Sequence, residues 1–211
     1  MKQLILLVVV TVLSACGEVE KEEDIAVENM SAVAADYALA YENASPLQLF
    51  FKEDQTRAIF REEGNTDISY IEETYWLSES YVKTLVEKDH KTWNSIYRIT
   101  ENTVEIIYEG VAELDATVAE LEKMPAKGIF LSLPLEVGTS FEGWLITDVD
   151  LEIETPFETF DQIMVLTKEN GGEEIRRFFA PGFGLVKETR TVETEERSIE
   201  TTSLLHHLEY R

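Results

Sequence analysis

The most regular pattern of potentially reactive side chains is a run of alternating carboxylates. Its members are Asp148, Asp150, Glu152 and Glu154, and an aliphatic residue separates each from the next. On a β-strand this spacing places all four on one face. Divalent cations choose carboxylate oxygens, so the face is a candidate site for a metal or a cationic ligand. Neighbours on one face lie about 6.6 Å apart and no calcium-loop motif surrounds them. A solvated strand face is therefore the alternative, and we expect no bound metal.

Catalytic constellations are hard to find elsewhere in the chain. The three histidines are His90, His206 and His207, and neighbours on a strand point to opposite faces, so the last two do not form a ligand pair. No nucleophile elbow, phosphate-binding loop or dinucleotide fingerprint occurs. Facing carboxylates, which a hydrolase would need, cannot be located from sequence. We expect a protein without catalytic residues or cofactor, with an envelope hydrolase as a distant alternative.

Aromatic side chains form the other candidate binding feature. They are Tyr70, Tyr75, Trp76, Tyr81, Trp93, Tyr97, Phe141, Trp144, Phe157, Phe160, Phe178 and Phe179. They could line a concave sheet and hold an acyl chain, a peptide or a glycan, or they could fill an ordinary core. Adjacent aromatics such as Phe178 and Phe179 must point to opposite faces, so both faces of those strands need a cover or a ligand.

Cys16 is the chain's single cysteine, and its surroundings indicate lipidation. Lys2 precedes an apolar run of about ten residues, which is too short to span a membrane and is typical of a secretory signal. The run ends in Leu-Ser-Ala-Cys at residues 13–16, which resembles the bacterial lipobox. That resemblance implies cleavage before Cys16, attachment of diacylglycerol and fatty acyl chains such as palmitate, and anchoring to the outer side of a membrane.

Composition excludes one class of partner. The 211 residues include 42 acids and 18 bases, which gives a formal net charge of −24. Such a chain cannot supply the basic field that nucleic acid requires. Because 44% of the residues are hydrophobic, the chain can still bury a core.

The order of patterns predicts three parts: a signal peptide at 1–15, an acidic tether with a possible short helix at 16–45, and one β-rich domain at 46–211. In the domain, short runs rich in β-branched and aromatic residues alternate with turn residues. Residues 111–123 are ambiguous. The strands are expected at 47–51, 56–62, 68–77, 81–87, 92–100, 103–108, 129–133, 157–167, 173–180, 185–194 and 198–209. Residues 140–146 and 147–154 are expected to form either one long strand or a bulged pair. Ten to twelve strands without βαβ spacing predict an antiparallel meander that forms a large curved sheet, a half-barrel or a two-sheet sandwich.

Several turn motifs are arranged in a familiar order. They are 60–65 (Phe-Arg-Glu-Glu-Gly-Asn), 134–141 (Pro-Leu-Glu-Val-Gly-Thr-Ser-Phe), 146–150 (Ile-Thr-Asp-Val-Asp), 155–160 (Thr-Pro-Phe-Glu-Thr-Phe) and 178–187 (Phe-Phe-Ala-Pro-Gly-Phe-Gly-Leu-Val-Lys). Over residues 47–190 the chain resembles a widespread group of β-rich bacterial envelope lipoproteins of unassigned function. The resemblance implies a fold and a location, and no catalytic residues. The chain departs from the group in its acidity and its charged end after Arg190.

Together these patterns predict a membrane-anchored envelope lipoprotein with a non-enzymatic binding or scaffolding domain. Its partners would be the membrane, through Cys16, and a cationic or apolar ligand. The alternative is a carrier or chaperone that holds a lipid or another apolar ligand in a half-barrel.

Overall fold

The structure, a computed structural model, describes residues 45–64, 67–194 and 196–211. Cys16, the signal peptide and the possible N-terminal helix lie outside the described residues. No helix in the described part is long and apolar enough to cross a membrane.

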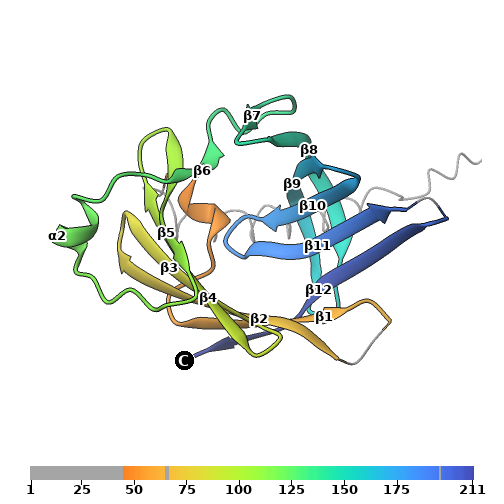
Figure 1. Cartoon of the computed structure of the whole chain (residues 1–211), viewed down its shortest axis with the longest axis horizontal. Coiled ribbons are helices and arrows are strands. Elements are labelled where there is room, and N and C mark those ends of the chain that lie inside the picture. The colour runs from red at the N-terminus through yellow and green to blue at the C-terminus, as the bar shows by residue number, and fades with distance from the viewer. Residues whose placement is uncertain (1–44, 65–66, 195) are drawn as a thin grey trace, which may run out of the picture. The chain divides into compact units, whose positions relative to one another are not determined.

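In the described part of the chain, twelve antiparallel strands form a single sheet, and this confirms the predicted mainly β fold (Figure 1). The strands follow one another around the sheet, except that β1 pairs with β12, in the order β6-β5-β4-β3-β2-β1-β12-β11-β10-β9-β8-β7. The sheet curves until its edge strands β6 and β7 lie close together, so that it nearly closes. In chain order the elements are η1 (Gln48–Phe50), β1 (Thr56–Glu62), β2 (Ile68–Ser78), β3 (Tyr81–Lys88), β4 (Lys91–Ile99), β5 (Thr103–Gly110), α2 (Val118–Leu121), β6 (Gly128–Ser132), β7 (Ser140–Phe141), β8 (Trp144–Glu154), β9 (Thr159–Asn170), β10 (Glu173–Ala180), β11 (Gly184–Glu193) and β12 (Ser198–Tyr210).

Residues 47–51 are not the strand that their apolar run predicts. Residues Gln48–Phe50 form one turn of 3-10 helix, and this segment lies inside the curve of the sheet (Figure 1). Leu47 is fully buried, and Phe50 and Phe51 are nearly so. A short apolar run predicts burial, but it does not distinguish a strand from a segment that plugs the interior of a curved sheet.

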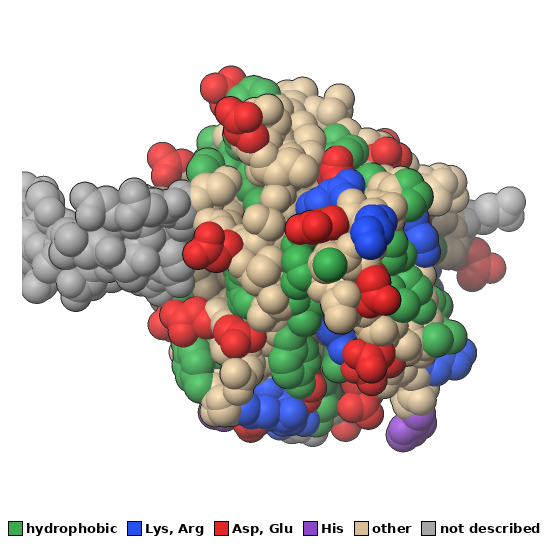
Figure 2. Space-filling view, turned by 90° about the vertical axis from the view of Figure 1, so that its left-hand side faces the viewer, with side chains coloured by type: hydrophobic (Ala, Val, Ile, Leu, Met, Phe, Trp, Pro, Cys, Tyr) green, Lys and Arg blue, Asp and Glu red, His purple; other side chains and the backbone are tan. Residues whose placement is uncertain are grey.

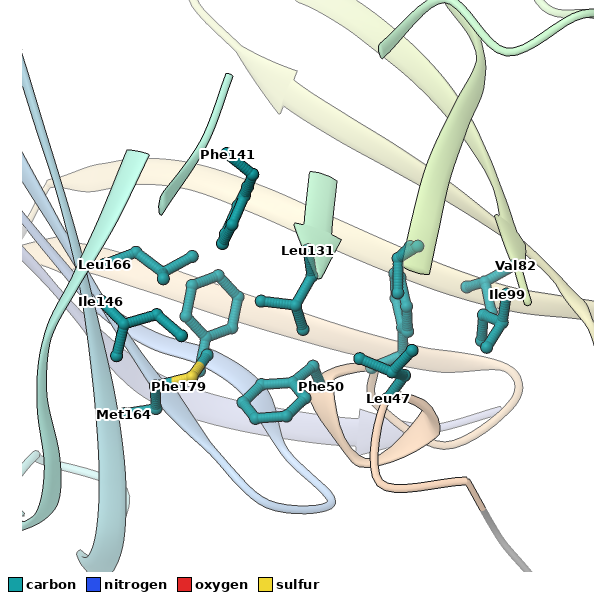
Figure 3. Packing of buried hydrophobic residues seen from close by; sticks show 12 residues of the cluster. Leu47, Phe50, Val82, Ile99, Leu131, Phe141, Ile146, Met164, Leu166 and Phe179 are labelled. Carbon is teal, nitrogen blue, oxygen red and sulfur yellow. The ribbon is translucent and has the colours of Figure 1, made fainter. Parts of the chain in front are cut away.

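One hydrophobic cluster fills part of the interior. Figure 3 shows Leu47 and Phe50 of the η1 segment between side chains of β8 to β10 and side chains of β3 and β4. A second cluster gathers residues of β1, β2 and β9 to β12. Phe179 belongs to the first cluster and Phe178 to the second, so the prediction that both faces of this strand are covered is confirmed.

The ambiguous segment at 111–123 is mostly loop, with the single helical turn α2. Thr117 and Glu120 form a capping box at its start. Leu121 is fully buried against Ile96 and Ile107 in a third cluster. Because Tyr97 packs in the first cluster, this loop covers the opposite face of β4 from the one that faces the interior.

A glycine-rich turn holds the η1 segment in place. The backbone N–H of Gly182 donates a hydrogen bond of 2.7 Å to the carbonyl oxygen of Leu49. At Gly184 the backbone has a φ of +62°, and a Cβ there would lie 3.0 Å from the carbonyl oxygen of Phe50. Glycine is therefore required at this turn by its positive φ and by the close approach of residues 47–51, which we call the η1 plug.

Candidate ligand cavity

A cavity of about 760 Å³ remains inside the sheet beside the η1 plug. Side chains from β2 to β6 and from β8 to β11 line it, together with Phe50, Phe51 and Lys52. The concave side of the sheet is thus partly filled and partly open.

Aromatic rings form one part of the wall, which we call the aromatic lining: Phe50, Phe51, Tyr97, Phe130 and Phe179. The ring of Phe130 lies 4.9 Å from that of Tyr97, 5.9 Å from that of Phe51 and 6.0 Å from that of Phe179, measured between centroids. Contacts at these distances bury apolar surface and favour ordered packing. This part of the wall offers an apolar surface to a ligand.

A buried ion pair lies at the base of the plug. The Nζ atom of Lys52 lies 2.6 Å from Oε1 of Glu72 and donates a second hydrogen bond of 3.0 Å to the carbonyl oxygen of Leu185. The Lys52 side chain is 1% exposed. The pair satisfies the lysine charge within the protein, so Lys52 is positioned mainly to hold the plug against β2 and β11.

Two arginines share one carboxylate on the β10–β11 side. The Nε atoms of Arg177 and Arg190 each donate a hydrogen bond of 2.9 Å to Glu188. Burial opposes the charge of Glu188, but the attraction of Arg177 and the hydrogen bonds from both arginines outweigh it, so the pKa of Glu188 is lowered. Glu188 is held in its charged form and fixes both guanidinium groups.

Trp144 lies against two cationic side chains. The Arg177 guanidinium carbon is 4.7 Å from the ring centroid, and Lys168 Nζ is 5.6 Å from it. Both distances are within the range of cation–π attraction. We call Lys168 and Arg177 the cationic pair. Lys168 also donates a hydrogen bond of 3.0 Å to the backbone carbonyl of Glu142.

Tyr70 places a buried hydroxyl at the same cavity. Its ring stacks on Phe60 at 4.4 Å, and its hydroxyl has no hydrogen-bond partner among the described residues. Burial, and then the nearby carboxylates of Glu188 and Glu72, raise the pKa of Tyr70 well above its ordinary value. The hydroxyl therefore remains protonated at neutral pH and can donate a hydrogen bond.

The charge of the cavity wall is opposite in sign to that of the chain. Six cationic and four acidic residues line it: Lys52, Lys88, Lys127, Lys168, Arg177 and Arg190, with Glu72, Glu109, Glu142 and Glu188. The whole chain has 18 bases against 42 acids. On the face that Figure 2 shows, acidic side chains are widely spread, and basic side chains occur in smaller groups. Positive charge is thus concentrated where a ligand would bind.

The acidic run predicted as a strand face is irregular. The β8–β9 pairing shifts register on both sides of Asp148 and again after Leu151, and Asp150 has a φ of +71°. These bulges break the two-residue period on which the expectation of one continuous carboxylate face depended. Within the described ranges, no group of three or more His, Cys, Asp or Glu side chains is arranged to hold a metal ion.

The two-residue period that would place His206 and His207 on opposite faces is interrupted at these residues. The register shifts between Ile59, which pairs with His207, and Phe60, which pairs with Leu205, so His206 is an extra, bulged residue. Both histidines are exposed. Only His207 approaches a carboxylate in the described part of the chain, with its Nε2 3.7 Å from Glu209.

The predicted aromatic residues lie in the buried clusters, at the cavity wall or, as Tyr70 and Phe179 do, in both, whereas Tyr75 belongs to neither. Five of them line the cavity, namely Tyr70, Trp93, Tyr97, Trp144 and Phe179. Sequence reasoning missed the cationic pair and the Lys52–Glu72 pair. One signal was present, because Arg177 shares its strand face with Ile175 and Phe179, and a charge between two inward apolar positions indicates a polar interior.

No protein-family model matches the chain, and no curated protein matches it. Its fold has a distant likeness to the crystal structure of a Bacteroides fragilis NCTC 9343 protein described as exported and as having a YMCC-like fold. The TM-score is 0.44 and the sequence identity 10%, and the match covers 76% of this chain and 98% of that one.

Proposed function

We propose that the protein is a lipid-anchored binding protein of the bacterial cell envelope, and that its ligand enters the cavity inside the sheet. The observation that carries this proposal is the open volume of about 760 Å³ beside a fixed plug. Binding pockets for small molecules commonly measure about 300–1,000 Å³ and combine apolar surface with a few placed polar groups. A domain that served only as a scaffold would have no need of such an opening.

Binding without catalysis is supported by the state of the cavity carboxylates. A general acid needs a raised pKa, whereas that of Glu188 is lowered by its two arginine partners. Glu72 is engaged by Lys52 at 2.6 Å. These groups are arranged to hold the wall together.

The anchor is supported by sequence alone. The lipobox-like residues 13–16 place the acylated thiol at Cys16, and the acidic stretch after it suits a tether that is repelled by anionic lipid. The domain would then be held off the outer side of a membrane.

A carrier or chaperone for an apolar ligand is the second candidate. The aromatic lining favours it, because the rings that remain at the cavity wall offer apolar surface to an acyl chain. Both candidates place the ligand in the same cavity.

The proposal is tested by filling the cavity. Ser95 on β4 lines it, whereas Thr92 on the same strand is exposed and does not, so Ser95→Phe fills the space and Thr92→Phe is the matched control. The full-length lipidated chain is extracted from its membrane in non-ionic detergent, unfolded, and the released small molecules are identified by mass spectrometry. We expect a compound present with wild type and T92F to be depleted with S95F.

Circular dichroism and the Tm show whether S95F is folded. If it is not, Ser95→Leu replaces it, because leucine fills the cavity with a smaller side chain. Identical compounds from wild type and from a folded filled variant would contradict binding in the cavity.

A further inference from the structure

We infer that the ligand of the cavity is an amphiphile with a single anionic head group, which Lys168 and Arg177 bind, and an apolar tail that packs on the aromatic lining. This inference rests on the proposed function and names the chemistry of the ligand.

The first argument is the charge that the wall leaves uncompensated. Lys168 makes no ion pair in the described part of the chain, and its Nζ donates only to the backbone carbonyl of Glu142. Lys127 likewise has no carboxylate partner there, and its Nζ lies 4.9 Å from the ring of Tyr108. Cations at a partly enclosed wall are stabilised by an anion, so the cavity favours a negatively charged ligand over a neutral or cationic one.

The second argument is the geometry of Arg177. Among the described residues, its guanidinium donates one hydrogen bond, from Nε to Glu188. A guanidinium has five N–H donors in a fixed fork, so the terminal nitrogens remain available for a carboxylate or phosphate. Glu188 orients the group in advance, and the Trp144 ring has both the Arg177 guanidinium and the Lys168 ammonium group within about 6 Å of its centroid. The cationic pair is thus positioned before a ligand arrives.

The third argument is the unpartnered hydroxyl of Tyr70. A buried hydroxyl without a hydrogen-bond partner destabilises the protein, because it has lost its hydrogen bonds to water. Tyr70 lines the same cavity as the cationic pair, and in its protonated form it can donate to an oxygen of a bound head group. A ligand with anionic oxygens would satisfy this donor.

The size of the cavity and its aromatic lining indicate that the ligand has an apolar tail. Inorganic phosphate or acetate would occupy a small part of about 760 Å³ and would leave the rings around Phe130 uncovered. A chain of methylene groups is stabilised by each group that is removed from water. An anion with an apolar tail therefore uses both parts of the wall.

The inference is tested by calorimetry with the full-length lipidated chain in phosphatidylcholine nanodiscs, with empty nanodiscs as the blank. The titrants are dodecanoate, dodecyl phosphate, dodecanol, dodecyltrimethylammonium, acetate and inorganic phosphate. We expect one or both anionic amphiphiles to bind at least about tenfold more tightly than the alcohol, because a charge-assisted hydrogen bond distinguishes them. Nanodiscs that contain phosphatidylglycerol separate a membrane lipid from a free acid, since a lipid ligand would compete with dodecanoate.

Variants assign the head-group site. Lys168→Gln and Arg177→Gln should each weaken dodecanoate binding about tenfold and leave dodecanol binding unchanged. Arg176→Gln is the matched control, because it removes the same charge from the other face of β10, where Arg176 contacts the ring of Phe178. The Tm of each variant shows whether it is folded. Lys168→Gln is the variant expected to disturb the fold least, because it removes a single hydrogen bond, from Lys168 Nζ to the carbonyl oxygen of Glu142.

Equal binding of dodecanol or of the ammonium amphiphile would overturn the anionic head group, and equal binding of acetate or phosphate would overturn the tail. Those results would leave the cavity itself in place as a binding site. Unchanged dodecanoate binding by folded S95F would instead overturn the proposed function.

Discussion

The ammonium group of Lys52 lies 2.6 Å from the carboxylate of Glu72, and this contact ties the plug of a nearly closed sheet to strand β2. The two side chains are 1% and 15% exposed. The Lys52 charge is shielded from bulk water and the Glu72 charge is mostly so, and each partner therefore depends on the other.

Replacement of Lys52 by Met should therefore destabilise the fold by about 3–5 kcal/mol, since it leaves an uncompensated buried carboxylate. The double variant Lys52→Met/Glu72→Gln should recover much of that loss. Urea denaturation measures both free energies of unfolding. Glu209→Gln, which breaks a partly exposed contact with Arg57, should change stability by no more than about 1 kcal/mol. A K52M effect of similar size to that of E209Q would show that the pair does not hold the plug.

Gly184 gives a second test of the plug. Gly184→Ala places a Cβ 3.0 Å from the carbonyl oxygen of Phe50, in a backbone with φ of +62°. Gly171→Ala is the matched control, because φ there is +58° and nothing lies within 4 Å. Both variants carry the left-handed backbone cost of about 1–2 kcal/mol, and G184A should be clearly less stable than G171A by thermal denaturation. Equal Tm values for the two variants would mean that the η1 segment can move away from residue 184 without a loss of stability.

The charge of Glu188 makes stability depend on pH. Its pKa in the folded protein is below the ordinary value of 4.5, so the unfolded chain binds more protons and folding stability falls as the pH drops through the folded-state pKa. At neutral pH, Glu188→Gln should be less stable than wild type by about 2 kcal/mol, because it loses charge-assisted hydrogen bonds from two arginines. That difference should shrink below about pH 4.5.

Urea unfolding between pH 7 and pH 3 measures this difference. Glu200→Gln, at an exposed position on β12, should follow wild type throughout. A gap between wild type and E188Q that stays constant down to pH 3 would contradict the assigned role of the carboxylate.

The regular strands could be predicted closely from the sequence. The bounds expected for β1 and β10 are those observed, because alternation between turn residues defines a strand locally. The helical turn at Gln48–Phe50 was missed, since its conformation depends on packing inside a sheet formed by the rest of the chain. The break at Glu142 and Gly143, which separates β7 from β8, was also missed.

The cavity could not be predicted because its parts come together only when the sheet curves. The register in which β8, β9 and β10 pair brings together one side chain from each strand: Trp144, Lys168 and Arg177. The acidic run at residues 148–154 differs from the regular strand expected, because its two-residue period was visible in the sequence while the bulges that interrupt it were not. The aromatic residues were identified as candidates for core packing or for the wall of a binding site, and the structure contains examples of each.

The anchor is tested in cells. Cys16→Ser should abolish labelling of the protein by a palmitate analogue and release it from the membrane fraction, because in the lipobox interpretation the thiol accepts the diacylglycerol. Ser14→Ala keeps a small residue before the cysteine and should leave labelling intact. Equal labelling of wild type and C16S would contradict the lipobox interpretation.

The central claim is tested most directly by the crystal structure of the protein with 12-bromododecanoate. The account predicts a bromine peak in the anomalous map beside the rings of Phe50, Phe130 and Phe179, with the carboxylate within hydrogen-bonding distance of Lys168 or Arg177. Bromine on the outer face of the sheet, or an empty cavity at saturating ligand, would contradict it.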